Sequence, residues 1–325
     1  MGRNSLISII IPVFDRAQTL PRLFTSLLGI TYRPLEIILV DNGSADHSFR
    51  LCAQFQAEYS VGGRSIFVYT ERRRGPCAAR NLGLACARGE YVYFFDSDDE
   101  VEAAFFTDAT PFVGKSDLIC APTVMKFADG HIKRRAFIPS NLPSAHILSA
   151  TLSTQTMLVR RRFLETVGGW NESLFRWNDW ELGIRLLCNV PSVRWLNKRH
   201  YHTIYQHSLS ISGRRYAQDY AALFSAIKQA KADIEVAPLC KTEKVQSYRA
   251  LYFKIQTVAV DLKRMQCLKE EREMLEFGRS MPVGKWYIQC SKIFYILLLC
   301  KVPAVWRLVW FLLKMARNGN VRITF

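Results

Sequence analysis

Long apolar runs are missing from this 325-residue chain: none reaches the roughly 20 uninterrupted residues that a membrane-spanning helix needs. The sequence also lacks a repeat of fixed period and a low-complexity linker, so its parts are expected to pack on one another. Its nine cysteines are odd in number and have no metal-ligand spacing. They are typical of reduced residues in a protein core.

Acidic residues are scarce: 28 Asp and Glu stand against 44 Lys and Arg, which gives a formal net charge of +16. A surface this basic attracts nucleic acids, anionic lipids or phosphorylated ligands. The basic residues are dispersed, with short clusters only at 72–74 and 133–135, and no nucleic-acid-binding motif is present. Anionic membranes and phosphorylated small molecules are therefore the favoured partners. The 49% hydrophobic content supports one sizeable core with an appendage.

Apolar runs rich in β-branched and aromatic residues predict buried strands at 6–11, 35–40, 65–69 and 91–95. Segments with helical spacing of apolar residues separate them, and Gly75 with Pro76 opens one such helix. Each strand ends in polar residues. This alternation predicts an α/β fold with a doubly wound, mostly parallel sheet that binds ligands outside the carboxyl ends of its strands.

The run at 91–95 ends abruptly in Asp96-Ser97-Asp98-Asp99-Glu100. Carboxylates crowded at a strand end repel one another unless a cation joins them, and ligand sets made only of oxygen suit Mg²⁺ or Mn²⁺. The alternative is an acidic turn or the first turn of a helix, where Asp and Glu are also common.

The order of the motifs resembles that of the family 2 glycosyltransferases, in particular those that build bacterial cell-surface polysaccharides. These are inverting, nucleotide-sugar-dependent enzymes with the GT-A fold. The resemblance rests on SIIIPVFD at 8–15, VDNGS at 40–44, ARNLG at 79–83 and FDSDD at 95–99. A later segment at 163–172 precedes WNDWEL at 177–182, where the family usually carries an acidic pair before a helix. The resemblance covers about residues 5–210.

The resemblance implies that Asp41 hydrogen-bonds the nucleobase, usually uracil, while the neighbouring turn accepts the ribose. It also implies that Arg80 binds the nucleotide or its diphosphate, for which a guanidinium is well shaped. Without those roles, Asp41 would cap a strand end and Arg80 would be a surface charge on a helix. The expected donor-binding residues are Pro12, Val13, Asp15, Asp41, Asn42, Arg80 and Asp96.

For the metal, the resemblance assigns Asp98 to the ion that bridges the two phosphates and gives Asp96 a supporting position nearer the ribose. Asp99 is expected to support the metal-binding carboxylates or to cap a helix. His207 matches a late loop that some family members fold over the diphosphate or the metal, and it completes the candidate metal ligands Asp98, Asp96 and His207. A lone histidine beside a tyrosine-rich strand is alternatively a structural residue.

Asp179 is the candidate general base. An acceptor hydroxyl is a poor nucleophile, and its attack on the anomeric carbon needs a carboxylate that takes the proton. The chain departs from the family at Asn178, where a glutamate is common, so one neighbouring charge is missing. The alternative role of Asp179 is to cap the helix expected at 180–187.

The expected organisation is a nucleotide-sugar-binding catalytic domain at 1–215, a helical extension at 216–284 and an amphipathic tail at 285–325. Helices are expected at 216–231, 242–265 and 268–277. The tail mixes aromatic and aliphatic residues with basic residues that share helical faces, and Pro303 interrupts it. Such a segment favours a membrane-interface helix; the alternative is a core or oligomerisation helix.

Together these features predict a metal-dependent transferase that uses Mn²⁺ or Mg²⁺ and moves a sugar from a UDP-sugar to a lipid-linked or growing surface glycan. No cleavable signal is visible, so it is expected on the cytoplasmic side of the cell membrane, peripherally bound. A non-catalytic relative with the same fold would be expected to have lost the paired aspartates or the base. A nucleotidyltransferase would be expected to carry a glycine-rich basic loop where this chain has PVFDR. Segments such as 123–156, which would choose the sugar and the acceptor, carry no decodable signature.

Overall fold

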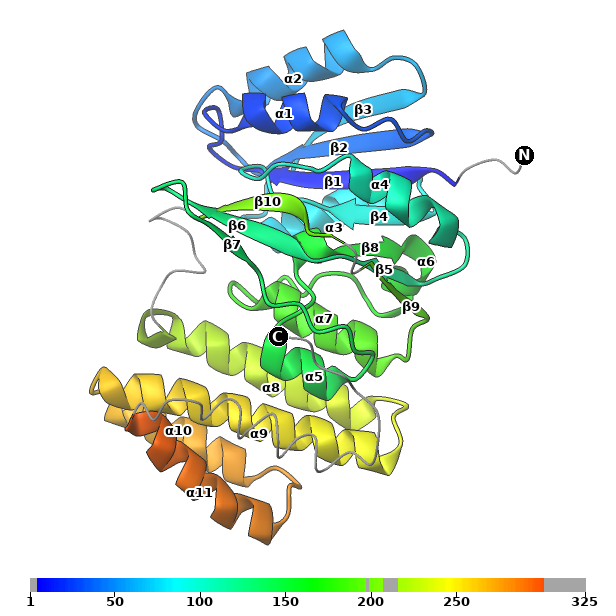
Figure 1. Cartoon of the computed structure of the whole chain (residues 1–325). Coiled ribbons are helices and arrows are strands. Elements are labelled where there is room, and N and C mark those ends of the chain that lie inside the picture. The colour runs from blue at the N-terminus through cyan, green and yellow to red at the C-terminus, as the bar shows by residue number, and fades with distance from the viewer. Residues whose placement is uncertain (1–4, 197–198, 207–215, 301–325) are drawn as a thin grey trace.

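A computed structural model describes residues 5–196, 199–206 and 216–300 of the chain. Its centre is a seven-stranded sheet of order β3-β2-β1-β4-β8-β5-β9 (Figure 1). The strands are β1 (Ile7–Val13), β2 (Leu35–Asp41), β3 (Arg64–Thr70), β4 (Tyr91–Phe94), β5 (Leu118–Cys120), β8 (Met157–Arg160) and β9 (Val193–Trp195). All neighbours pair in parallel except β8, which runs antiparallel to β4 and β5. The predicted α/β, mostly parallel sheet is thereby confirmed.

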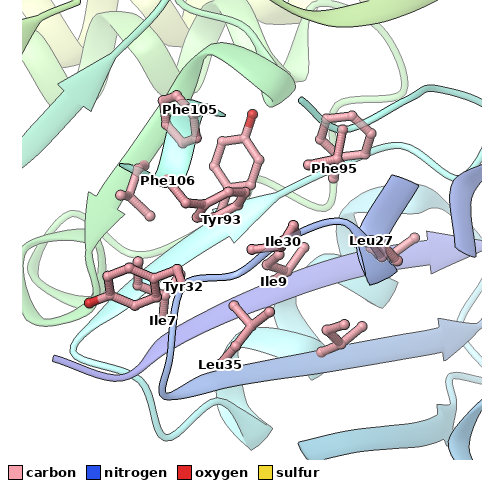
Figure 2. Packing of buried hydrophobic residues seen from close by; sticks show 14 of the residues in the cluster. Ile7, Ile9, Leu27, Ile30, Tyr32, Leu35, Tyr93, Phe95, Phe105 and Phe106 are labelled. Atoms are coloured by element: carbon pink, nitrogen blue, oxygen red, sulfur yellow. The ribbon is translucent and has the colours of Figure 1, made fainter. Parts of the chain in front are cut away.

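Helices cover both faces of this sheet because successive side chains of a strand point to opposite sides. In β1, Ile7, Ile9 and Ile11 pack toward one face and Ile10 toward the other. Figure 2 shows part of the first core, where side chains of the sheet meet Leu27, Phe105 and Phe106. The helices on that face are α1 (Leu20–Leu28), α2 (Ser48–Tyr59) and α4 (Ala104–Ala109), and those on the other are α3 (Pro76–Cys86), α6 (Arg161–Thr166) and α7 (Asn178–Cys188).

A second, three-stranded sheet of order β10-β6-β7 lies beside the carboxyl ends of the main strands. It consists of β6 (Thr123–Phe127), β7 (Ile132–Arg134) and β10 (Tyr201–Gln206). Three short helices lie elsewhere: η1 (Thr110–Phe112) contacts α4, α5 (Pro143–Ser149) contacts α7 and α9, and η2 (Thr154–Thr156) contacts β4. The backbones of Glu100 and Thr203 exchange two hydrogen bonds of 3.0 Å. This bridge fixes β10 against the acidic turn that follows β4.

The helical C-terminal extension that the sequence predicts is also confirmed. It comprises η4 (Tyr216–Asp219), α8 (Tyr220–Val236), α9 (Lys241–Arg264), α10 (Leu268–Arg279) and α11 (Lys285–Leu299), which stack below the sheet in Figure 1. Ile147 of α5 and Trp180 and Ile184 of α7 share one buried cluster with α8 and α9. The extension therefore packs directly on the helix that carries Asp179. Within the described ranges, no helix combines the length and the hydropathy that crossing a bilayer requires.

Candidate active site

A cavity of about 760 Å³ opens where β1, β2 and β4 end. The strand order changes direction between β1 and β4, and such a switch point is where open α/β sheets bind their ligands. Seven of the predicted site residues line this cavity: Pro12, Val13, Asn42, Arg80, Asp96, Asp98 and Asp179. Asp15 and Asp41 are not among the lining residues, and His207 lies outside the described residues.

Arg80 is a buried cation at the base of the cavity. Its side chain is only 6% exposed, and its Nη2 donates to Asp96 Oδ1 at 2.7 Å. The guanidinium carbon lies 4.4 Å from the ring centroid of Trp170, a cation–π contact that holds its plane. Nε and Nη1 are buried and have no hydrogen-bond partner among the described residues. The alternative of a surface charge is therefore excluded.

The motif around Arg80 and the later glycine-rich segment are one structural unit. Asn81 donates to the carbonyl of Trp170 at 2.8 Å and accepts from its backbone N–H at 2.9 Å. Gly83 lets α3 lie close against β1, because a Cβ there would sit 2.3 Å from Cγ2 of Ile10. These contacts fix both the helix that carries Arg80 and the indole ring that packs on it.

The acidic turn after β4 divides its carboxylates between distinct roles. Both oxygens of Asp96 accept hydrogen bonds, one from Arg80 and one from Gln155 Nε2 at 2.6 Å. Asp98 lines the cavity, is 25% exposed and lies 3.5 Å from Arg16 Nη2. Asp99 is buried and accepts from Gln155 and from the backbone N–H of Tyr205. Burial raises the pKa of Asp99 well above its usual range, and the charges of Asp98 and Asp96 add to the effect. Of the two expected roles for Asp99, its contacts match the supporting one.

Asp179 occupies the first turn of α7 and faces the same cavity. Its Oδ1 accepts from the backbone N–H of Trp180 at 2.9 Å, but α7 begins at Asn178 after Trp177, so Asp179 lies inside the helix and not at its cap position. Burial raises the pKa of Asp179 above its ordinary value, while the nearby cations Arg135 and Arg80 act in the opposite direction. The result is a carboxylate that is more basic than a surface aspartate, as proton abstraction requires.

Three predicted residues, Asn42, Asp15 and Asp41, make hydrogen bonds within the loops that surround the cavity. The Asn42 amide donates to the carbonyls of Glu71 and Arg73 and accepts from the N–H of Gly75. It thus holds the loop that opens α3, and its expected part in donor binding stays a prediction. Asp15 accepts from the N–H groups of residues 45 and 46 and joins two strand-end turns. Asp41 Oδ2 caps its own turn, whereas its buried Oδ1 has no hydrogen-bond partner among the described residues.

Several cavity residues were not predicted from the sequence as site residues. They are Arg16, Arg74, Arg135, Gln155, Phe175 and Tyr205. Arg135 belongs to the basic cluster 133–135, but its guanidinium turns inward and donates to Ser153 and to the carbonyl of residue 150, whereas its two predecessors are exposed. Gln155 reaches Asp96 only because η2 returns to the end of β4. A sequence pattern does not encode either contact.

The described residues include no group of three or more His, Cys, Asp or Glu side chains that could enclose a metal ion. Mg²⁺ and Mn²⁺ need no such group, since one or two carboxylates together with substrate phosphates are a usual ligand set. Asp98 fits that requirement because its carboxylate is partly exposed and lines the cavity. Asp96 fits it poorly because both of its oxygens are already hydrogen-bonded.

Comparison with known proteins agrees with the motif order. A sequence model of glycosyl transferase family 2 matches residues 8–168, about half of the chain. The chain belongs to glycosyl transferase family 2. Among curated relatives, the cholesterol galactosyltransferase of Borreliella burgdorferi is 31% identical over 41% of this chain and 37% of its own length. Glycosyltransferase GlyG of Streptococcus pneumoniae is 35% identical over 30% of this chain and 32% of its own length. The matched segments thus span about a third of these relatives.

Solved structures resemble this family 2 member over most of its length. S. aureus TarS 1–349 in complex with UDP-GlcNAc superposes with a TM-score of 0.63 and 19% identity, covering 84% of this chain and 91% of that one. The mannosyltransferase PcManGT of Pyrobaculum calidifontis, in complex with GDP-Man and Mn²⁺, gives a TM-score of 0.54 at 14% identity over 94% of this chain and 88% of that one. At such identities the likeness concerns the fold, and it agrees with the GT-A-type architecture expected from the sequence.

Proposed function

We propose that this chain is an inverting glycosyltransferase that moves a sugar from a nucleoside-diphosphate sugar to a hydroxyl of a lipid-linked or growing cell-surface glycan. One observation carries the proposal: a single cavity contains a buried guanidinium, strand-end carboxylates and a separate carboxylate of raised pKa. These are the groups needed to bind a diphosphate and to remove a proton from an acceptor.

Three observations support a nucleotide-sugar donor, with uridine as the proposed nucleoside. The two unpaired donors of Arg80 are suited to phosphate oxygens. The unpaired, buried Oδ1 of Asp41 is suited to the N–H of a uracil ring, and leaving such an acceptor without a partner costs about 1–3 kcal/mol. The structural neighbours named above were solved with UDP-GlcNAc or GDP-Man.

Asp98 is the residue proposed to hold the divalent ion, with Asp96 supporting the donor site through Arg80. When bound, Mg²⁺ or Mn²⁺ would offset the charge that develops on the nucleoside-diphosphate leaving group. Gln155 holds the carboxylates of Asp96 and Asp99 close together, because its Nε2 lies 2.6 Å from an oxygen of each. Asp98 stands between them in the chain and lines the cavity, which supports its proposed role as the ligand of the ion.

Asp179 is the proposed general base for a single displacement. The acceptor oxygen forms a bond to the anomeric carbon while the bond from that carbon to the diphosphate oxygen breaks, and Asp179 takes the hydroxyl proton. Arg80 stabilises the negative charge that the departing diphosphate acquires. One attack from the face opposite the leaving group inverts the anomeric configuration.

Titration calorimetry of the wild-type protein with UDP tests the donor proposal. We expect UDP to bind about 5- to 150-fold more tightly with Mn²⁺ than with chelator, the usual range of coupling between two ligands of one site. Titration with GDP is the matched control and should give weaker binding. Tight binding of GDP without binding of UDP would reject the uracil assignment, and absence of any nucleotide binding would reject the proposal as a whole.

We also propose that the outer side of α11 contacts an anionic membrane surface, with the cytoplasmic face of the cell membrane as the location. The inner side packs on α9, where Tyr287 donates to the carbonyl of Arg249 at 3.1 Å. The outer side exposes Trp286 by 76% and Ile293 by 60%. Lys285, Lys292 and Ile296 fall on the same exposed stripe. An aromatic residue with aliphatic and basic neighbours on one face suits the interface of an anionic bilayer. The part of the predicted tail from 301 onward lies outside the described residues.

The double variant Trp286→Ser/Ile293→Ser should bind anionic vesicles about tenfold more weakly than wild type, since each of these side chains contributes apolar area. Co-sedimentation with phosphatidylglycerol-containing vesicles measures the effect. These variants are preferable to truncation at 284, which would also strip α11 from Phe253 and its neighbours in the core. Val236→Ser, at a residue that is 83% exposed on α8, is the matched control. Equal binding by all three proteins would reject the membrane role of α11.

A further inference from the structure

Arg16 lies at the mouth of the cavity, close to the carboxylate proposed to hold the metal. Its Nη2 is 3.5 Å from Asp98 Oδ2, and its Nη1 donates to the carbonyls of Phe14 and Asp15 at 3.2 Å. Its backbone is fixed: the N–H donates to Ser48 Oγ at 2.7 Å, and the carbonyl accepts from the first residues of α1. The residue is therefore anchored while its guanidinium stays within the cavity.

The two ion pairs of the acidic turn differ in strength. In the Arg80–Asp96 pair the guanidinium is 6% exposed, the contact is 2.7 Å and an indole ring supports it. In the Arg16–Asp98 pair the side chains are 40% and 25% exposed, and the contact of 3.5 Å is too long for a strong hydrogen bond. Exposed ion pairs of this kind contribute little to stability. The second pair can therefore exchange partners at small cost, whereas the first cannot.

A third arginine near the turn does not share this behaviour. Arg22 donates to the backbone carbonyl of Asp98, stacks 3.6 Å from the ring centroid of Tyr205 and lies 3.9 Å from a carboxylate oxygen of Glu100. It braces the turn and the neighbouring strand β10. Arg16 is thus the arginine whose guanidinium approaches the Asp98 carboxylate itself in the described contacts.

We propose that Arg16 is a further donor-binding residue, which pairs with Asp98 before the donor binds and transfers to the diphosphate when the metal–nucleotide complex enters. This inference rests on the proposed function. A guanidinium and a divalent cation compete for one carboxylate, so Arg16 weakens binding of the metal alone. Once released, the same guanidinium meets phosphate oxygens, to which its planar fork is well matched. Arg16 thereby makes metal binding depend on the nucleotide.

The proposal predicts effects of opposite sign for one substitution. Arg16→Gln should bind Mn²⁺ alone about two- to fivefold more tightly than wild type, because an exposed competing ion pair is removed. In the presence of Mn²⁺ it should bind UDP about 10- to 100-fold more weakly, because charge-assisted hydrogen bonds to phosphate are lost. Arg16→Lys keeps the charge without the fork, so its affinity for Mn²⁺ alone should stay near wild type while its affinity for UDP still falls.

Calorimetric titrations of Mn²⁺ alone and of UDP in saturating Mn²⁺ measure both quantities. Arg74→Gln is the matched control because it removes one positive charge from the wall of the same cavity. If Arg74→Gln changes the Mn²⁺ affinity as much as Arg16→Gln does, the effect comes from the overall positive charge of the cavity. The proposed exchange of Arg16 between Asp98 and the diphosphate is then rejected. The exchange is also rejected if wild type binds both ligands and Arg16→Gln lowers both affinities or changes neither. Failure of the wild type itself to bind UDP and Mn²⁺ overturns the proposed function and this inference with it.

Discussion

Asp179→Asn is expected to lower turnover by about two to four orders of magnitude, the usual contribution of a general base, while the affinity for UDP stays within about twofold of wild type. The amide preserves the size of the side chain, and its Oδ1 can still accept from the N–H of Trp180, as the carboxylate does at 2.9 Å. Only the capacity to take a proton is lost. Turnover is measured as UDP release with the UDP-sugar that gives the highest wild-type rate.

The pH dependence of turnover is an independent test of Asp179 as the general base. A base must be ionised, so turnover falls as the pH drops through the pKa of Asp179. Burial raises that pKa, which moves the acid limb of the wild-type profile to a higher pH than an ordinary aspartate would give. The limb should disappear in Asp179→Asn.

Asn178→Ala is the matched control for Asp179→Asn, since it alters the adjacent side chain, which does not line the cavity, and leaves the carboxylate in place. Near wild-type turnover by Asp179→Asn, or an equal loss in Asn178→Ala, would remove the base assignment and leave Asp179 as a structural residue at the start of α7.

The sequence predicted the sheet and the carboxyl-end cavity because both follow from local pattern. β1 alternates its isoleucines between two cores, and the polar residues that close β1, β2 and β4 must meet at one edge of a parallel sheet. Five of the seven predicted residues that line the cavity lie at these strand ends, whereas Arg80 and Asp179 lie on α3 and α7 and were predicted from the resemblance to family 2. Asp41 and Asp15 were predicted from the resemblance, and each uses a carboxylate oxygen to hold its turn.

Side-chain contacts between segments that are distant in the chain could not be predicted from the sequence. Gln155 stands in a segment without a motif, and its hydrogen bonds to Asp96 and Asp99 depend on how η2 and β8 fold back on β4. The sequence also does not show which side of α11 is buried. Tyr287 and Trp286 are both aromatic, but Tyr287 packs on α9 whereas Trp286 is exposed. The composition of α11 predicts an amphipathic helix. It does not predict which side the protein covers.

Asp98→Asn and Asp96→Asn should separate the two carboxylates of the acidic turn. Asp98→Asn is expected to abolish the gain in UDP affinity that Mn²⁺ provides in wild type, about 5- to 150-fold, because the amide removes the charge that holds the ion. Asp96→Asn should keep that gain but bind UDP more weakly both with Mn²⁺ and with chelator. Its effect arises through Arg80, whose guanidinium it positions at 2.7 Å.

Thermal unfolding distinguishes these variants further. Asp96→Asn leaves the 6%-exposed Arg80 without its ionised partner, and a charged hydrogen bond of this kind contributes about 1.5–3 kcal/mol, so its midpoint should fall by a few degrees. Asp98→Asn weakens the exposed 3.5 Å contact with Arg16, and we expect it to unfold near the wild-type temperature. The reverse pattern, with metal dependence lost in Asp96→Asn and kept in Asp98→Asn, would show that the ion binds Asp96. The proposed role of Arg16 as a competitor for Asp98 would then have no basis.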